Sequence, residues 1–400
     1  MGITVVAAPA GTRTRSMFGL LAGVAFVNTA MVGASTAASL IASESSGPAW
    51  GGVPNAATVL GTALGALSSG TLMARHSRRF ALLVMYCMAV TGGVVAFAGA
   101  VTGTLAPLLA GMVLLGLGNG GAQLSRYVAA ELYPENRRGF ALSAVVWGGT
   151  VGALAGPALI APAAAGAERL GLPGLSGPVG VAVLMIAAAL VSTTTLPRAV
   201  AGPGGSEEPV LPPSPVRTVL RRPAVTTALV AMVAAQVVMV ALMVMTPLQL
   251  HDHGHGLDVV AWVLSAHMIG MFALAPVSGR VADRWGGRAA IGAGVVTLVL
   301  AAGTAVAVPT AHVVGLPVAL FLLGYGWNLV FVGGSSLLSR DLPIEDRSRV
   351  QGVVDALVWG ASGLASLSAG QLFGSGGFAL VAVVAGVLAL APLPLLIRRG

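Results

Sequence analysis

Two short patterns place soft metal ligands at helical spacing inside apolar segments. Met239 and Met243 are four residues apart in "ALVAMVAAQVVMVALMVMTPLQL", and His267 and Met271 have the same spacing in "AHMIGMF". Residues four apart lie on one face of a helix, so each pair presents its two ligands together. Counting residues along the helix puts all four side chains roughly 10 to 20 Å from the end of their apolar segment. Three thioethers and one neutral imidazole suit a soft, singly charged ion such as Cu(I) better than Zn(II), Mg(II) or Ca(II).

Each pattern also has a simpler interpretation. Methionine is flexible and often fills gaps between apolar helices, so the pair of Met239 and Met243 is weak evidence by itself. A lone histidine can simply hydrogen-bond a neighbouring helix, but ionisable groups within membrane segments are rare and usually functional. We therefore interpret His267 as a functional residue, and the two pairs together as a candidate site for a soft metal ion.

Other polar residues extend this candidate site. The segment "HDHGHG" at 251–256 would either gather a borderline metal such as Cu(II) at a pore entrance or form a solvated turn, and both interpretations stand. Asp355 is an acid inside an apolar segment, where it would exchange protons or pair with an arginine. The accessory metal candidates are His251, Asp252, His253, His255 and Met31. The candidates for lining a cavity or joining helices are Asn28, Asn119, Gln123, Gln236 and Asn328.

Composition identifies the elements that must position these residues. Of 400 residues, 56% are hydrophobic and 8% charged, whereas soluble domains carry about 25% charged residues. Apolar runs long enough to cross roughly 30 Å of hydrocarbon recur along the whole sequence, which predicts an all-α integral membrane protein. The single cysteine, Cys87, excludes an internal disulfide and a cysteine-cluster metal site. We expect no permanently bound cofactor, and a first helix that is not cleaved as a signal peptide.

The apolar runs predict twelve transmembrane helices in two halves. The expected spans of the first half are 17–41, 52–74, 80–101, 106–130, 139–162 and 178–196, and those of the second are 224–249, 258–280, 288–309, 313–338, 350–372 and 376–397. The segment 197–223 is too polar and proline-rich to join the bundle. We therefore predict an N-terminal six-helix half over 1–196, a cytoplasmic linker over 197–223 and a C-terminal six-helix half over 224–400.

The two halves repeat each other in sequence. "LGLGNG" at 115–120 aligns with "LGYGWN" at 323–328, and "GTLMARHSRR" from Gly70 aligns with "GRVADRWGGR" from Gly279. Duplicated six-helix units are typical of transporters, in which the substrate binds at the interface of the halves near the bilayer midplane.

Arginine placement predicts the orientation, since the sequence contains no lysine. With the N-terminus inside, the linker arginines and most others fall on the cytoplasmic side, whereas Arg169 falls in an outer loop. The composition, rich in Ala, Val, Leu and Gly, is that of a bacterial protein from a high-GC genome. We predict a multi-pass protein of the bacterial cytoplasmic membrane with both termini cytoplasmic.

One short pattern connects this topology to a known family. The residues Gly279, Asp283, Arg284, Gly286 and Arg288 resemble the cytoplasmic loop signature of the major facilitator superfamily. The first-half copy keeps Arg75, Arg78 and Arg79 but lacks the acid. The resemblance implies the major facilitator fold, with two pseudo-symmetric six-helix halves, and implies that these residues form a cytoplasmic latch.

A narrower resemblance concerns the paired motifs. Met-x-x-x-Met followed by His-x-x-x-Met in consecutive spans resembles the CcoA-like copper importers, as do "GYGWNLVFVGGSSLL" and "SRVQGVVDALVWGASGLASLSAG". The resemblance implies that Met239, Met243, His267 and Met271 handle copper. Some relatives in the wider family carry riboflavin and lack the paired motif, which leaves an organic substrate open.

The sequence therefore predicts a copper-importing secondary transporter that works by alternating access and functions as a monomer in the lipid bilayer. The alternatives are a proton-coupled carrier of a small organic molecule, such as a flavin or drug, and a non-transporting metal receptor or assembly factor. The sequence contains no Walker loop, zinc-protease motif or nucleophile elbow, so we expect no enzymatic activity. The net charge of +8 follows from membrane orientation and does not indicate nucleic acid.

Overall fold

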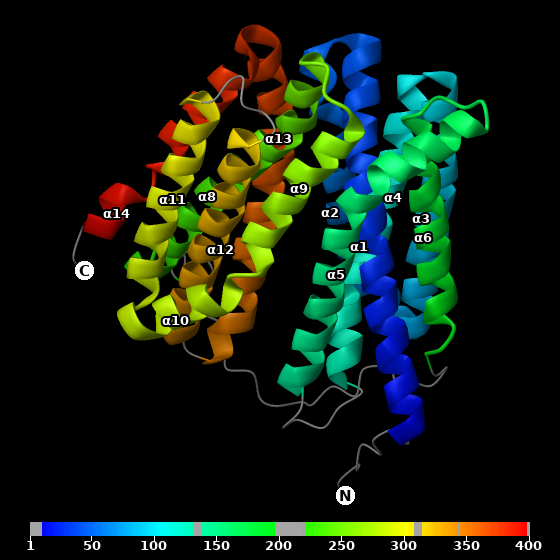
Figure 1. The fold of residues 1–400 in the computed structure, drawn as a ribbon. Helices are drawn as coiled ribbons and strands as arrows, with labels where there is room; N and C mark the ends of the chain where they lie inside the picture. Colours follow the sequence, from blue (N-terminus) through cyan, green and yellow to red (C-terminus); the bar gives the residue numbers. More distant parts are fainter. Residues whose placement is uncertain are drawn as a thin grey trace, which may run out of the picture. The chain divides into compact units, whose positions relative to one another are not determined.

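The computed structural model describes residues 10–131, 138–196, 219, 221–307, 314–341 and 344–397, and within these ranges every regular element is helical. The elements that precede the linker are α1 (Ala10–Ser46), the short 3-10 helix η1 (Pro48–Trp50), α2 (Val53–Arg75), α3 (Arg78–Thr102), α4 (Leu105–Glu131), α5 (Arg138–Arg169) and α6 (Ser176–Thr193). Those that follow it are α8 (Pro223–Asp252), α9 (Leu257–Phe272), α10 (Ala275–Trp285), α11 (Gly287–Ala307), α12 (Gly315–Asp341), α13 (Ile344–Ala389) and α14 (Leu393–Ile397). The predicted all-α fold class is confirmed (Figure 1).

Ten stretches of the described helices are long and apolar enough to cross a membrane. They are consistent with the twelve predicted spans for two reasons. The last stretch, Ala356–Ile397, contains a break at Gly376 and Gly377 and so covers parts of two predicted spans. Helix α2 covers the predicted span 52–74 but is not one of the ten.

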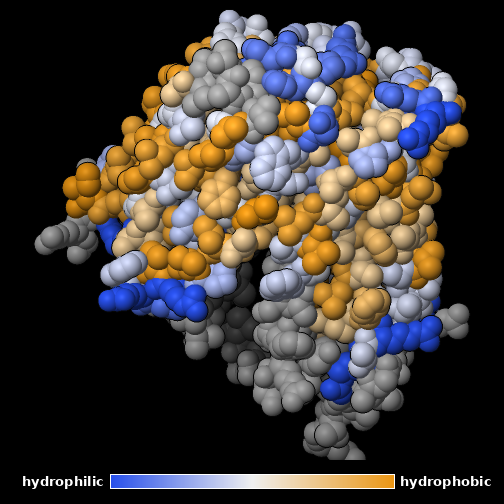
Figure 2. Space-filling model, viewed as in Figure 1, coloured by the Kyte–Doolittle hydropathy of each residue, from blue (hydrophilic) through white to orange (hydrophobic). Residues whose placement is uncertain are grey.

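Hydrophobic side chains cover much of the visible face between the helix ends (Figure 2). Hydrophilic residues gather at the helix ends. This is the distribution that a bilayer requires, since apolar side chains face the hydrocarbon and polar groups the water.

Local sequence explains several helix ends. The Ser77 side chain accepts a hydrogen bond from the Phe80 amide at 3.2 Å and so caps the first turn of α3. Gly103 ends the same helix in the left-handed conformation, at φ 65°, and Gly286 turns the chain between α10 and α11 at φ 86°. These two glycines adopt backbone angles that other residues rarely tolerate.

The chain forms two compact units. Unit 1 comprises Met1–Ile41 and Ala57–Gly205, and unit 2 comprises Ala42–Ala56 and Ser206–Gly400. The described part of the predicted linker is limited to residue 219 and residues 221–223.

The segment Ala42–Ala56 differs from the predicted halves because it packs with unit 2. Gly52 lies directly against α13, where the Ser366 hydroxyl donates a hydrogen bond to the Gly52 carbonyl at 2.8 Å. A Cβ atom at Gly52 would collide with the Ser366 backbone, so a side chain here would force the two segments apart.

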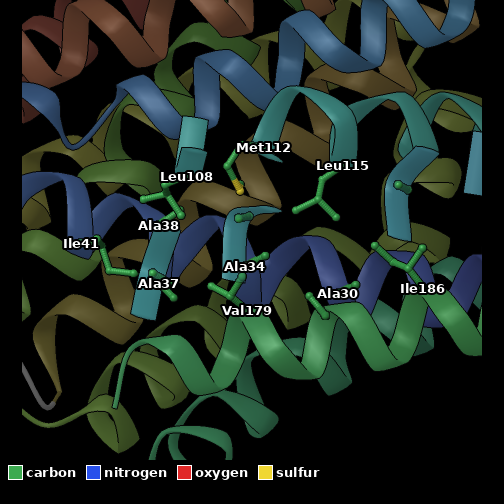
Figure 3. Packing of buried hydrophobic residues seen from close by; sticks show 14 residues of the cluster. Ala30, Ala34, Ala37, Ala38, Ile41, Leu108, Met112, Leu115, Val179 and Ile186 are labelled. Atoms are coloured by element: carbon green, nitrogen blue, oxygen red, sulfur yellow. The ribbon is translucent and has the colours of Figure 1, made fainter. Parts of the chain in front are cut away.

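Small residues let the helices of unit 1 pack closely. Figure 3 shows a row of alanines on α1, including Ala30 and Ala34, lying against α6 near Val179 and Ile186. The four labelled alanines of α1 are at most 1% exposed. Because lipid is as apolar as these side chains, close van der Waals packing between small residues provides much of the association between membrane helices.

Candidate functional site

The predicted His-x-x-x-Met motif lies where α9 crosses α12 within unit 2. A Cβ atom at Gly270 would collide with the Phe321 carbonyl, and one at Gly324 would collide with the His267 carbonyl. The two backbones therefore touch at this crossing, because neither glycine has a side chain. This contact holds His267 and Met271, one turn apart on α9, against the Leu320 to Gly324 turn of α12.

His267 is fully buried, at 0% exposure, and one of its ring nitrogens is bound across the crossing. Nδ1 lies 3.0 Å from the Leu320 carbonyl oxygen. A carbonyl oxygen can only accept, so Nδ1 carries the hydrogen and donates it. In the neutral ring Nε2 then has a free lone pair, and the buried Nε2 has no hydrogen-bond partner among the residues that the structure describes.

Asn328 repeats this arrangement on the other side of the crossing. Its Nδ2 donates to the Met271 carbonyl at 2.8 Å, whereas its buried Oδ1 has no hydrogen-bond partner in the described ranges of the chain. The unpartnered atom is an acceptor here too. The crossing therefore holds two immobilised side chains, each with one acceptor left over.

Met239 and Met243 lie on α8 at the level of this crossing. Gln236 of α8 bonds Trp327 of α12, and Met232 lies against Gly334, so the two helices run antiparallel. Moving three and seven residues along α8 from Gln236 reaches the two methionines, and moving equally far back along α12 reaches Gly324 and Leu320. Met239 is 7% exposed and Met243 half-buried.

The four predicted copper ligands thus share one level of unit 2, but they reach it from two different helices that both pack on α12. His267 and Met271 lie directly against α12. Among the described residues, no hydrogen bond joins the imidazole of His267 to the methionines of α8. A metal site formed by all four remains a prediction.

A second polar contact joins three helices of unit 2. The Trp327 indole N–H donates to Gln236 Oε1 at 2.8 Å, and Gln236 Nε2 donates to Ser362 Oγ of α13 at 2.9 Å. The Trp327 ring stacks on Phe331, with centroids 4.5 Å apart and an interplanar angle of 27°. Gln236 was predicted to line a cavity or join helices, and it joins helices, whereas Trp327 and Ser362 carried no sequence signal beyond their apolar surroundings.

The polar candidates of unit 1 also make helix contacts. Asn28 Nδ2 donates to the Gly149 carbonyl at 3.0 Å, and Asn119 Nδ2 to Thr62 Oγ1 at 3.3 Å. Met31 packs against two apolar clusters of this unit. The side chains of Gln123 and Asp355 lie outside the described residues, so proton exchange at Asp355 stays a prediction.

The structure does not bring the histidine-rich segment 251–256 together as a metal site. His251 Nε2 lies 3.0 Å from Glu44 Oε1, and His253 Nδ1 lies 2.8 Å from the Gln249 carbonyl. The part of the chain that the structure describes, which includes Asp252 and His255, contains no group of three or more His, Cys, Asp or Glu placed to hold a metal. His251 and His253 instead contact Glu44 and a backbone carbonyl.

The predicted latch residues make contacts within their own units. Arg288 Nη2 donates to the Leu395 carbonyl at 2.6 Å, and Arg79 Nη1 donates to the Leu196 carbonyl at 2.7 Å. These equivalent arginines bind carbonyls at the end of the last helical region of each unit, where a positive charge is favourable.

The other predicted latch residues have different surroundings. Arg284 lies over the Trp285 ring at 5.5 Å, and no atom of the other described residues lies within 4 Å of a Cβ position at Gly279. Asp283 has an interaction partner. The side chains of Arg75 and Arg78 lie outside the described residues, so their latch function remains a prediction.

Comparison with known proteins identifies relatives along the whole chain. The family model described as Major Facilitator Superfamily matches residues 16–257 and 241–399. The chain is 28% identical over 401 residues to the uncharacterized MFS-type transporter YdeG of Bacillus subtilis (strain 168), covering 96% of this chain and 92% of that protein. It is also 28% identical over 363 residues to the riboflavin transporter RfnT of Brucella anthropi, covering 88% of each.

Solved structures show the same fold at lower identity. The structure of a D-xylose-proton symporter matches with a TM-score of 0.71 at 17% identity, covering 95% of this chain and 96% of that one. At this identity the likeness concerns the fold alone.

Proposed function

The chain belongs to the Major Facilitator Superfamily, and from this membership we propose that it is a secondary transporter that carries a small, neutral, aromatic organic molecule of the flavin class. We place it in the cytoplasmic membrane and propose import by alternating access. The observation that carries the substrate class is the 28% identity to a riboflavin transporter over 88% of both chains. The geometry of α8, α9 and α12 is compatible with such a substrate.

A flavin has a flat heteroaromatic ring, and unit 2 offers a fixed aromatic surface for it. Trp327 is half-buried, and its orientation is set by the hydrogen bond to Gln236 and by stacking on Phe331. Aromatic rings held in place lose little conformational entropy when they stack on a ligand, and such stacking contributes about 0.5–1.5 kcal/mol beyond area burial. We propose that this ring contacts the substrate.

Copper is the second candidate substrate. What favours it is His267 Nε2, a buried nitrogen with a free lone pair, together with three methionines at the same level. Neutral nitrogen and sulfur ligands suit Cu(I). The names of the relatives give copper no support, and among the described residues the outer histidines form no metal site.

The two substrates are separated by parallel flux measurements with purified protein in liposomes. Riboflavin and Cu(I) uptake would be compared in the wild type, in Trp327→Leu and in the double variant Met239→Leu with Met243→Leu. Leucine preserves volume but removes sulfur, so the methionine variant tests coordination with little effect on packing.

We expect riboflavin uptake by the wild type, loss of that uptake in Trp327→Leu, and normal riboflavin uptake in the methionine variant. Cu(I) uptake that the methionine variant abolishes, without riboflavin uptake by the wild type, would refute the flavin proposal and favour copper. Binding of copper without flux of either compound would favour the metal receptor.

A further inference from the structure

We propose that His267 Nε2 and Asn328 Oδ1 act as a pair of acceptors that recognise two hydrogen-bond donors of the transported molecule. For a flavin, one donor is the imide N–H of the ring and the other a hydroxyl of the ribityl chain. The inference rests on the proposed function, and it makes both residues determinants of substrate specificity.

The two free atoms have the same chemistry. Both side chains use their donor, Nδ1–H or Nδ2–H, to bind a backbone carbonyl across the crossing of α9 and α12. What remains on each is a buried acceptor that has no hydrogen-bond partner within the part of the chain that the structure describes. Buried polar atoms are nearly always hydrogen-bonded, so two unpartnered acceptors at one helix contact require an explanation. A ligand that brings two donors satisfies both.

The internal repeat contains the same helix crossing without these two side chains. In unit 1, α2 meets α4 at Gly61 and Gly116, which align with Gly270 and Gly324 of unit 2. A Cβ atom at Gly116 would meet the Thr58 carbonyl and the Thr62 amide, as one at Gly324 would meet the carbonyl of His267 and the amide of Met271. The packing geometry is therefore the same in the two units.

The polar side chains differ between these two crossings. Thr58 occupies the position of His267 and has an interaction partner. Gly120 occupies the position of Asn328 and has no side chain. The helix contact can thus form with a threonine and a glycine at these two positions, so packing alone does not account for His267 and Asn328. Unit 2 carries two unsatisfied acceptors that the repeat shows to be unnecessary for the fold.

Access to the two acceptors requires a local movement. Both atoms are covered by protein atoms in this structure. Met271 lies on the same crossing, with its Cγ 3.1 Å from a Cβ position at Gly324. An unbranched methionine side chain changes rotamer readily, so it can make room without moving either backbone.

Copper binding and hydrogen-bond recognition would use different atoms of this crossing. An amide oxygen is a hard ligand that suits Cu(I) poorly, so copper transport gives Asn328 no function. Recognition by hydrogen bonds gives Asn328 the same importance as His267 and requires no sulfur from Met239 or Met243.

The test is uptake of riboflavin and two analogues by purified protein in liposomes. 3-Methylriboflavin lacks the imide N–H, and lumiflavin lacks the ribityl hydroxyls. The variants are His267→Thr, which introduces the residue of the equivalent unit 1 position, and Asn328→Ala. Asn119→Ala, which removes an amide from the equivalent helix of unit 1, is the matched control, and a thermal melt of each variant reports folding.

In the wild type we expect each analogue to be transported about tenfold less well than riboflavin, because it leaves a buried acceptor without a donor. We expect each unit 2 variant to remove the penalty of one analogue and keep that of the other. Asn119→Ala should keep both penalties.

Normal riboflavin uptake without a penalty for either analogue, or with penalties that survive in both variants, overturns this proposal while leaving the proposed function intact. Such a result would mean that water or another side chain satisfies the acceptors. Absence of riboflavin uptake in a folded wild type overturns the proposed function and this inference with it.

Discussion

The hydrogen bond between Gln236 and Trp327 should be measurable as a coupling between two positions 91 residues apart. Gln236 is 2% exposed and makes two side-chain hydrogen bonds, one to Trp327 Nε1 and one to Ser362 Oγ. Hydrogen bonds between membrane helices contribute about 0.6 kcal/mol on average and up to about 1.7 kcal/mol. Gln236→Leu, which loses both, should therefore lower the free energy of unfolding by about 1–3 kcal/mol.

A double-mutant cycle with Trp327→Phe isolates the bond between these two residues. Phenylalanine removes the indole N–H, and the packing lost with the larger ring is removed in both backgrounds and cancels in the cycle. We expect a coupling free energy of about 0.6–1.7 kcal/mol, the range of a single bond of this kind. The measurement is reversible unfolding in mixed micelles.

The same variant tests the connection to transport. Without Gln236 the half-buried indole can adopt other orientations, and ordering a side chain on binding costs about 0.5–1.5 kcal/mol. We expect the KM for riboflavin to rise about two- to tenfold in Gln236→Leu, since 1.4 kcal/mol is tenfold. A coupling free energy of zero would show that this hydrogen bond does not hold the ring. An unchanged KM would show that it does not prepare the ring for a substrate.

Three further predictions concern packing and surface charge. Gly324→Ala should destabilise unit 2 by about 1–3 kcal/mol, because the added Cβ meets backbone atoms that cannot rotate away. Gly303→Ala lies in open space on α11 and should be neutral or slightly stabilising. Thermal melts of the two variants test this difference. Arg288→Leu should lower the melting temperature, because it loses the hydrogen bond to the Leu395 carbonyl. Arg288→Lys should recover part of the lost melting temperature. An unchanged melting temperature in the leucine variant would contradict this contact. Glu44→Gln should change stability by less than about 1 kcal/mol, because Glu44 and His251 are about half exposed; a larger loss in an unfolding titration would mean that the pair does more than a surface ion pair.

Much of the architecture is determined by the sequence directly. A bilayer requires long apolar runs, and helices satisfy their own backbone hydrogen bonds, so the spans could be located by counting. The repeat of "LGLGNG" in "LGYGWN" predicted two similar halves, and the glycines in these segments form equivalent helix crossings. Spacing of four residues likewise predicted that His267 and Met271 share one face of their helix.

The tertiary structure decided which atoms those residues have available. A helical period fixes which side chains share a face, but the rotation of each helix and its neighbours depend on packing between distant segments. Asn328, predicted only as a polar lining or helix-joining residue, proves to bind the Met271 carbonyl and keep one acceptor free. The histidine-rich segment, which composition made a metal candidate, is placed against Glu44 and a backbone carbonyl. Residue type and spacing set the chemistry that each helix carries, while contacts between segments distant in the chain decide which of its donors and acceptors remain unpaired.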